Sequence, residues 1–137
     1  MIYVLDSSFV GAQIIPDEKD PKVDKLYAKI KRDDEKHVPH MLWYEMANIF
    51  KNLLRRNRYT YDKILHFFPY LAAMNLICDF ATGTEYSKKL LQLCNDYNLS
   101  SYDASYLELA ERKKAVLCTL DETLRAAAKK YGVVTLK

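Results

Sequence analysis

The sequence contains few of the residues that break or cross-link a chain. Of its 137 residues, three are glycine, four are proline and three are cysteine. No stretch rich in serine, glycine or proline separates two blocks of different composition, and no repeat is visible. A chain of this length fits one domain and buries roughly two-thirds of the surface exposed by its unfolded form. We therefore expect residues 1–137 to form a single domain.

Long apolar runs are also missing. Charged or polar residues interrupt every apolar stretch before it approaches the roughly 18 to 20 residues that a membrane helix needs. The chain opens with the strand-like segment Met1–Leu5, without the basic region, apolar segment and small-residue cleavage site of a secretory leader. We expect a cytoplasmic protein with no membrane partner.

The cysteines do not indicate cross-links or zinc. They are odd in number, widely spaced and set in apolar surroundings, at Cys78, Cys94 and Cys118. The nearby pair His37 and His40 lies far from any cysteine in the sequence, so a zinc site is not expected. The net charge of +3 is compatible with a polyanionic partner without indicating one.

Short apolar segments alternate with longer amphipathic ones. The expected strands are Ile2–Leu5, a short segment around Val38, Leu76–Phe80, Ala115–Leu120 and Val133–Leu136. The expected helices are Ser8–Ile14, Pro21–Asp33, Met41–Arg56, Tyr61–Ala73, Glu85–Tyr97, Tyr102–Lys113 and Glu122–Tyr131. This alternation predicts an α/β fold, a three-layer α/β/α sandwich with a central, mainly parallel sheet of four to five strands.

Two aspartates directly follow predicted strands. Asp6 ends the segment Ile2–Leu5, and Asp121 ends the segment Ala115–Leu120. Open α/β sheets bind their ligands at the carboxyl ends of the strands, so both residues are candidates for a site there. Each also precedes a predicted helix, and N-capping alone would account for either one.

Two further acids border hydrophobic helix faces. At 100° per residue, Asp103 shares a face with Tyr106, Leu107 and Ala110. Its carboxylate is therefore expected to point inward, which costs several kcal/mol unless it is hydrogen-bonded, paired or bound to metal. Glu45 borders the apolar face of its own helix beside Asn48 and Asn52, although an ordinary exposed glutamate is the alternative there.

Taken together, the four acids predict a divalent-metal site. At an effective dielectric near 20, two carboxylates ~5 Å apart repel each other by roughly 3 kcal/mol, and a bound Mg²⁺ or Mn²⁺ ion would reverse that penalty. Ligation by oxygen alone selects such hard cations over zinc or copper. The predicted ligands and catalytic residues are Asp6, Glu45, Asp103 and Asp121.

The segments around these acids also carry a family resemblance. They are Val4–Ser8, Tyr44–Asn48, Ser101–Ala110 and Cys118–Leu124. In order and spacing they resemble PIN-domain ribonucleases of the VapC toxin type, over the whole chain. The resemblance implies a PIN-like fold and a metal-dependent endoribonuclease whose acidic quartet holds one or two Mg²⁺ or Mn²⁺ ions. It also implies RNA hydrolysis by metal-activated water, a cognate antitoxin as the partner in a type II toxin–antitoxin pair, and a homodimer.

The resemblance assigns lesser roles to three more residues. Ser8 occupies the family's hydroxyl position two residues after the first aspartate, and Asn48 and Thr119 are expected to support the acids. Some relatives carry a further acid two residues after the fourth one, where this chain has Thr123. Whether one or two metal ions bind is therefore left open.

Basic and aromatic residues beyond the acids are candidates for RNA contact. The helix that carries Glu45 continues into four cations that could bind the RNA backbone, Lys51, Arg55, Arg56 and Arg58. A solvated helix end that complements the helix dipole is the alternative. Among eleven tyrosines, Tyr59 and Tyr61 are the first candidates for base stacking. The segment His66–Leu71 is expected either to pack in the core or to bind an antitoxin helix or a second copy.

Two other functions are compatible with parts of the pattern. One is a non-catalytic RNA- or protein-binding domain with a PIN fold, which the four intact acids argue against. The other is a phosphorelay receiver domain, which requires adjacent acids after the first strand and a lysine after a late one. Here Ser7 follows Asp6, and no lysine has a clear counterpart position.

Overall fold

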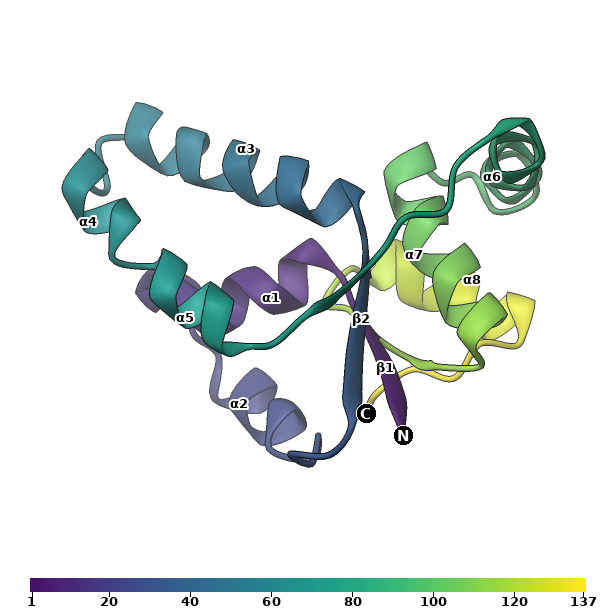
Figure 1. The fold of residues 1–137 in the computed structure, drawn as a ribbon, viewed down its shortest axis with the longest axis horizontal. Helices are drawn as coiled ribbons and strands as arrows, with labels where there is room; N and C mark the ends of the chain where they lie inside the picture. Colours follow the sequence, from purple (N-terminus) through teal and green to yellow (C-terminus); the bar gives the residue numbers. More distant parts are fainter.

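The computed structural model describes residues 1–137 and contains one parallel sheet between two groups of helices (Figure 1). Its strands are β1 (Ile2–Leu5), β2 (Glu35–Pro39), β3 (Ile77–Asp79) and β4 (Val116–Cys118). Their order across the sheet is β3-β2-β1-β4, and every pairing is parallel. β1 is therefore an inner strand that pairs with both β2 and β4.

Helices cover both faces of this sheet. They are α1 (Ser7–Ile14), the 3-10 turn η1 (Pro16–Glu18), α2 (Pro21–Tyr27), α3 (Met41–Arg55), α4 (Tyr61–Leu65), α5 (Phe68–Ala73), α6 (Thr84–Tyr97), α7 (Ser101–Lys113) and α8 (Glu122–Tyr131). In Figure 1, α1 to α5 lie on the left of β1 and β2, and α6 to α8 lie on the right. The predicted three-layer α/β/α architecture is confirmed. No helix has both the length and the apolar character needed to cross a bilayer.

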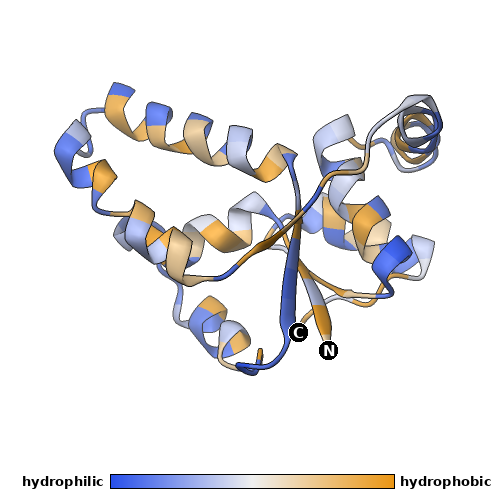
Figure 2. Ribbon diagram, viewed as in Figure 1, coloured by the Kyte–Doolittle hydropathy of each residue, from blue (hydrophilic) through white to orange (hydrophobic).

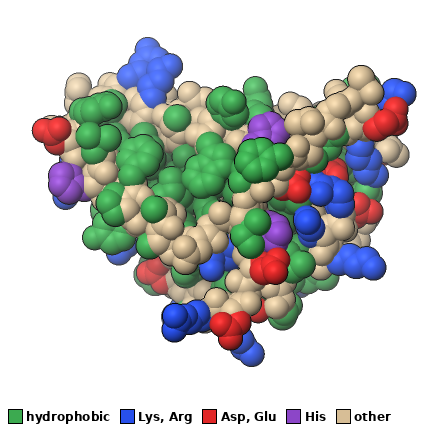
Figure 3. Space-filling model, viewed as in Figure 1, with side chains coloured by type: hydrophobic (Ala, Val, Ile, Leu, Met, Phe, Trp, Pro, Cys, Tyr) green, Lys and Arg blue, Asp and Glu red, His purple; other side chains and the backbone are tan.

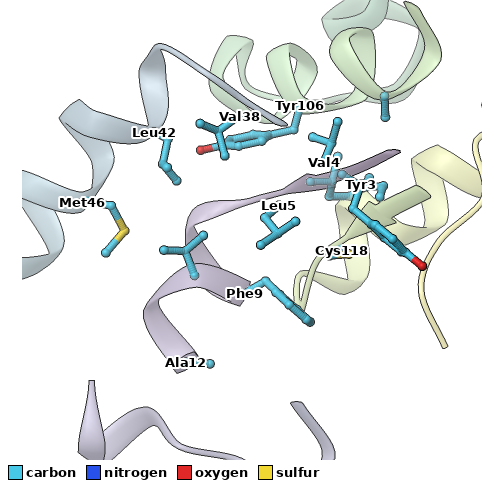
Figure 4. Packing of buried hydrophobic residues seen from close by; sticks show 14 of the residues in the cluster. Tyr3, Val4, Leu5, Phe9, Ala12, Val38, Leu42, Met46, Tyr106 and Cys118 are labelled. Carbon is cyan, nitrogen blue, oxygen red and sulfur yellow. The ribbon is translucent and has the colours of Figure 1, made fainter. Parts of the chain in front are cut away.

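The core is built around β1. Val4 and Leu5 are completely buried, and Phe9 from α1 and Tyr106 from α7 pack around them (Figure 4). Figure 2 shows that β2, in contrast, begins with hydrophilic residues, and Glu35 at its start is exposed. Burial of apolar surface therefore fixes β1 between the two helix layers, and with it the residues that directly follow β1.

The structure differs from the sequence-based expectation in three elements. The expected strand Val133–Leu136 is reduced to a single bridge between Thr135 and Leu117, so the sheet has four strands. The expected helix Tyr61–Ala73 is two helices, because Pro69 lacks an N–H and starts a new helix instead of continuing one. The expected helix Pro21–Asp33 ends at Tyr27, and the backbone N–H of Lys31 then bonds to the carboxylate of Asp34 in a turn.

The connections bring four chain segments to one edge of the sheet. α1, α3 and α8 begin where β1, β2 and β4 end. α7 runs back before β4, so its first turn lies at the same edge. The chain adds β2 and β3 on one side of β1 and β4 on the other, which makes the gap between β1 and β4 the point where the strand order reverses. Open α/β sheets bind ligands at such a point.

Candidate active site

Asp6 occupies the end of β1 and caps helix α1. Its Oδ1 accepts hydrogen bonds from the backbone N–H of Phe9 at 2.9 Å and from the hydroxyl of Ser8 at 2.7 Å, and its Oδ2 accepts one from Thr119. The residue is only 4% exposed. Burial raises the pKa of Asp6 to about 6, although the three hydrogen bonds oppose this rise. The capping interpretation is therefore correct, and the carboxylate is nevertheless costly to ionise.

Ser8 and Thr119 join the ends of β1 and β4. The Ser8 hydroxyl accepts a hydrogen bond from the backbone N–H of Leu120 at 3.0 Å, and the Thr119 hydroxyl accepts one from the N–H of Asp121 at 3.0 Å. Each hydroxyl also donates to Asp6. The two residues thus lie where the family resemblance expects supporting groups, and they fix Asp6 against the segment that carries Asp121.

Asp121 and Asp103 lie close enough for their charges to interact. Asp121 is exposed and caps α8 by accepting from the N–H of Leu124 at 2.9 Å. Asp103 is half-buried in the first turn of α7, where its own N–H donates to the hydroxyl of Ser100 at 3.1 Å. Burial raises the pKa of Asp103, and the negative charge of Asp121 raises it further.

Glu45 lies one turn into α3 and is held by two hydroxyls. Tyr106 donates to Oε1 at 2.6 Å and Ser7 donates to Oε2 at 3.1 Å. Figure 4 shows the ring of Tyr106 beside Val38, with its hydroxyl directed toward α3. Burial raises the pKa of Glu45, and the charge of Asp103 adds to this effect. Tyr106 and Ser7 were not predicted as site residues, although Tyr106 lies one turn after Asp103 on the same helix face.

Asp103 electrostatically connects all four acids. Its charge raises the pKa values of Asp6 and Glu45, and it is itself affected by Asp121. None of the ion pairs in the structure includes any of the four. The sequence therefore predicted four residues that the fold does bring to one edge, and no lysine or arginine pairs with them there.

The donor set suits a hard divalent cation. All candidate ligands are carboxylate oxygens, which are the ligands that Mg²⁺ and Mn²⁺ prefer. No three acidic, histidine or cysteine side chains in the structure stand close enough together to share one ion. Mutual repulsion favours such separation, and a bound cation would offset it. The chemistry of the donors fits a metal, and its binding requires the carboxylates to move closer.

A groove of about 450 Å³ adjoins the acids along α3. Ser7 and Glu45 form one part of its wall, and Asn48 and Asn52 continue that wall along the helix. Tyr44 from α3 and Tyr102 from α7 also line it. Asn48, which was predicted to support the acids, is thus exposed in the groove and is not bonded to a carboxylate. The two tyrosines were missed in the sequence because nothing distinguishes them from nine others.

The predicted RNA-contacting cations differ in availability. Lys51, Arg55 and Arg56 are exposed at the far end of α3. Arg58 instead pairs with Asp17 at 3.2 Å. The expected stacking residue Tyr59 packs edge-on against Phe67 with ring centroids 5.2 Å apart, so that expectation was wrong for Tyr59.

The segment His66–Leu71 divides between core and surface. Phe67 and Leu71 are buried, as the core-packing alternative predicts, whereas Phe68 and Tyr70 are 45% and 67% exposed. Figure 3 shows hydrophobic side chains gathered over α3 and α5 on this face of the molecule, with most charged groups toward its edges. This surface is available to a protein partner.

Comparison with known proteins identifies one family and several similar proteins. The model of the PIN domain matches residues 3–130. The chain is 26% identical to "Ribonuclease VapC3" of Pyrobaculum aerophilum over 124 residues, which are 90% of this chain and 92% of that protein. The crystal structure of PAE2754 from Pyrobaculum aerophilum has a TM-score of 0.70 at 24% identity and covers 98% of this chain and 83% of its own. The crystal structure of FitAcB from Neisseria gonorrhoeae has a TM-score of 0.59 at 14% identity, with coverages of 100% and 97%.

Proposed function

This chain belongs to the PIN domain family, and we propose that it is a VapC-type endoribonuclease that acts as the toxin of a type II toxin–antitoxin pair. One observation carries the proposal: four carboxylates from distant parts of the chain lie at the edge of the sheet that holds the switch point, near enough for their charges to interact, and no cation of the protein pairs with them. The similarity to a ribonuclease over nine-tenths of the chain supports RNA as the substrate.

Asp6, Glu45, Asp103 and Asp121 would hold one or two Mg²⁺ or Mn²⁺ ions. Such an ion would act as a Lewis acid, lowering the pKa of a bound water and offsetting the negative charge of a phosphodiester. The carboxylates differ in their freedom to rearrange around it. Asp6 is fixed by three hydrogen bonds and Glu45 by two, whereas Asp121 is exposed. We therefore infer that Asp6 and Glu45 define the position of the site and that Asp121 adjusts to it.

The surrounding backbone favours a bound phosphate. Helices α1, α7 and α8 all begin at this edge, and the amino end of a helix carries a partial positive charge that attracts anions. Lys51, Arg55 and Arg56 at the far end of α3 add a cationic surface for the RNA backbone. These groups attract the substrate while the acids remain free to bind a cation.

An antitoxin, a second copy of the chain and a cytoplasmic location belong to the same proposal. Hydrophobic side chains gather over α3 and α5, and Phe68 and Tyr70 are exposed there. A contiguous exposed hydrophobic surface is typical of a site that binds a protein partner. We assign the antitoxin or the homodimer to this surface. Size-exclusion chromatography with light scattering on the protein alone tests the homodimer, and a monomer would contradict it.

The test of the enzymatic proposal is cleavage of labelled RNA by purified protein in Mg²⁺, in Mn²⁺ and in a chelator. We expect cleavage with either ion, none with the chelator, and none in the Asp103→Asn variant. Glu111→Gln is the matched control, because Glu111 is an exposed carboxylate on the same helix. Protein that binds RNA but leaves it uncut in both ions would instead support a non-catalytic binding domain.

A further inference from the structure

We propose that the groove beside Glu45 binds unpaired RNA nucleotides adjacent to the cleaved bond, with Tyr44 and Tyr102 stacking on bases and Asn48 and Asn52 contacting base edges. This inference rests on the endoribonuclease function proposed above and adds how that enzyme would select its substrate. None of the four residues belongs to the acidic quartet, so their contribution can be separated from catalysis.

The position of the groove connects it to the chemistry. Glu45 forms part of its wall, and Tyr102 directly precedes Asp103 on α7. A strand whose phosphate lies at the acids would therefore place its neighbouring nucleotides in the groove. Because the groove and the acids share residues, its occupant must be compatible with a substrate at the acids. A continuous RNA strand meets that condition.

The two tyrosines have the properties of stacking residues. Tyr44 is 65% exposed and Tyr102 is 51% exposed, and they line the groove from two different helices. An aromatic ring stacks on the face of any base and contributes ~1–3 kcal/mol per base in single-stranded complexes. Both rings line the groove beside the acids of the proposed active site, where the bases of a bound strand would reach them.

The two asparagines add groups that can distinguish bases. Asn48 and Asn52 are exposed and lie three and seven residues after Glu45, on the same side of α3. An amide both donates and accepts hydrogen bonds, and it can pair with the edge of an unpaired base. Ile49 supplies an apolar contact in the same wall. The combination of amide, apolar and aromatic groups is suited to a base more than to a phosphate.

The charge along α3 continues this arrangement. Arg55 lies three residues after Asn52 and is exposed on the same side of the helix. The order along this side of α3 is therefore carboxylate, amide, amide and cation, with the cation beyond the end of the groove. Base-contacting groups next to the acids and a phosphate-contacting group beyond them fit one RNA strand that follows α3. A-form duplex does not fit, because its bases are already stacked and paired.

The experiment measures binding independently of cleavage. Labelled ten-nucleotide single strands and duplexes would be titrated with the Asp103→Asn protein in Mg²⁺, and binding would be followed by fluorescence anisotropy. Adding Tyr44→Ala or Tyr102→Ala should weaken single-strand binding about tenfold. Tyr44→Phe should restore it, because the ring remains. Leu91→Ala is the control, since Leu91 is a similarly exposed apolar side chain on α6, outside the groove and outside the surface assigned to a protein partner.

The amides and the arginine should give different patterns. Asn48→Ala should change the order of affinity among oligo(A), oligo(C) and oligo(U), because base-edge contacts carry the discrimination. Arg55→Ala should weaken all three similarly and reduce the dependence of affinity on salt. Asn95→Ala on α6 is the control for the loss of an exposed amide.

The outcomes separate this inference from the proposed function. If Tyr44→Ala, Tyr102→Ala and Leu91→Ala all bind single strands within twofold of the parent protein, the inference is overturned even when the wild type cuts RNA. If the tyrosine variants lose binding and the wild type cuts nothing, the groove assignment holds and the enzymatic proposal fails. The inference would also be overturned if the tyrosine variants lost affinity for duplex RNA as much as for single strands, because stacking on the rings requires unpaired bases.

Discussion

Helix α7 carries two acidic regions that differ in how their charge is balanced. Near its end, the guanidinium of Arg112 donates to both oxygens of Asp79 at 3.1 and 2.7 Å and to both oxygens of Glu108 at 2.7 and 3.2 Å. At its start, Asp103 faces three other carboxylates and has no cationic partner. One region contains its counterion and the other lacks one.

The consequences for ionisation are opposite. Arg112 holds the pKa of Asp79 below its ordinary range, whereas burial and neighbouring charges raise the pKa values of Asp6, Glu45 and Asp103. The first arrangement attaches α7 to the end of β3 and is complete as it stands. The second is unfavourable until a cation binds. Glu108 and Asp103 thus lie on the same helix and differ in whether a cation of the protein pairs with them. This difference assigns Glu108 a structural role and Asp103 a functional one.

The largest difference is expected in catalysis. Asp103→Asn should lower RNA cleavage by about 100-fold or more, which is the scale of losing a group that stabilises the transition state. Arg112→Met should leave cleavage within about threefold, because Arg112 touches none of the four acids. Initial rates on one labelled RNA measure both. Equal losses in the two variants would remove the distinction between the regions.

Stability should respond in the reverse order. Arg112→Met leaves Glu108, which is only 6% exposed, as a buried carboxylate without its partner. We expect a loss of about 3 kcal/mol in the free energy of unfolding at pH 7, the scale of an unpaired buried charge. Urea unfolding at constant m-value measures it. The double variant Arg112→Met with Glu108→Gln should recover part of the loss, and no recovery would contradict this explanation.

Removing the charge of Asp6 from the proposed metal site should stabilise the metal-free protein. The folded-state pKa of Asp6, about 6, lies above its ordinary value near 4, so ionised Asp6 disfavours folding by about 3 kcal/mol at pH 7. An amide loses about 1 kcal/mol of that gain in weaker hydrogen bonds. Asp6→Asn should therefore gain about 2 kcal/mol at pH 7 in a chelator.

The gain from Asp6→Asn should depend on pH, because it comes from the ionisation of Asp6. The penalty is fully present above pH ~6 and disappears as the pH falls below ~4, because Asp6 is then protonated in both states. The advantage of Asp6→Asn should shrink accordingly between pH 7 and pH 4. Thermal unfolding at both pH values, with Asp62→Asn as an exposed control, measures it. An advantage independent of pH would exclude ionisation as its cause.

The smallest effect is expected from the hydroxyl that positions Glu45. Tyr106→Phe removes the 2.6 Å hydrogen bond to Oε1 while keeping the buried ring. We expect the free energy of unfolding to fall by about 1 kcal/mol and the apparent affinity for Mn²⁺ to weaken several-fold. Calorimetric titration of Mn²⁺ measures the affinity. Unchanged affinity would show that Glu45 needs no such support.

The sequence predicted the fold well where apolar patterns are regular. β1 and α3 were placed within a residue of their observed ends, because burial imposes period and length on them. The predicted strand Val133–Leu136 was wrong, because this segment makes only the single bridge between Thr135 and Leu117. A hydrophobic pattern does not show how many residues of a neighbouring strand a segment will pair with. The division between α4 and α5 could have been anticipated from Pro69.

The site was less accessible to sequence reasoning than the fold. Asp6 and Asp103 could be selected because a strand end and an inward helix face are visible in the pattern. Their supporting hydroxyls from Ser7 and Tyr106 depend on which helix packs against which, and that is a tertiary property. The groove tyrosines have no pattern of their own. The metal ligands themselves stay a prediction.

The bond between Thr119 and Asp6 joins residues 113 positions apart, and β1 pairs with β4 at the same place. During translation, Asp6 and the segment that carries Asp121 therefore come together only after β4 has been synthesised and has paired with β1. Pairing over such a separation is slow compared with local helix formation. If the proposed nuclease function is correct, a nascent chain on the ribosome, surrounded by RNA, would stay inactive until Asp121 has been synthesised and β4 has paired with β1.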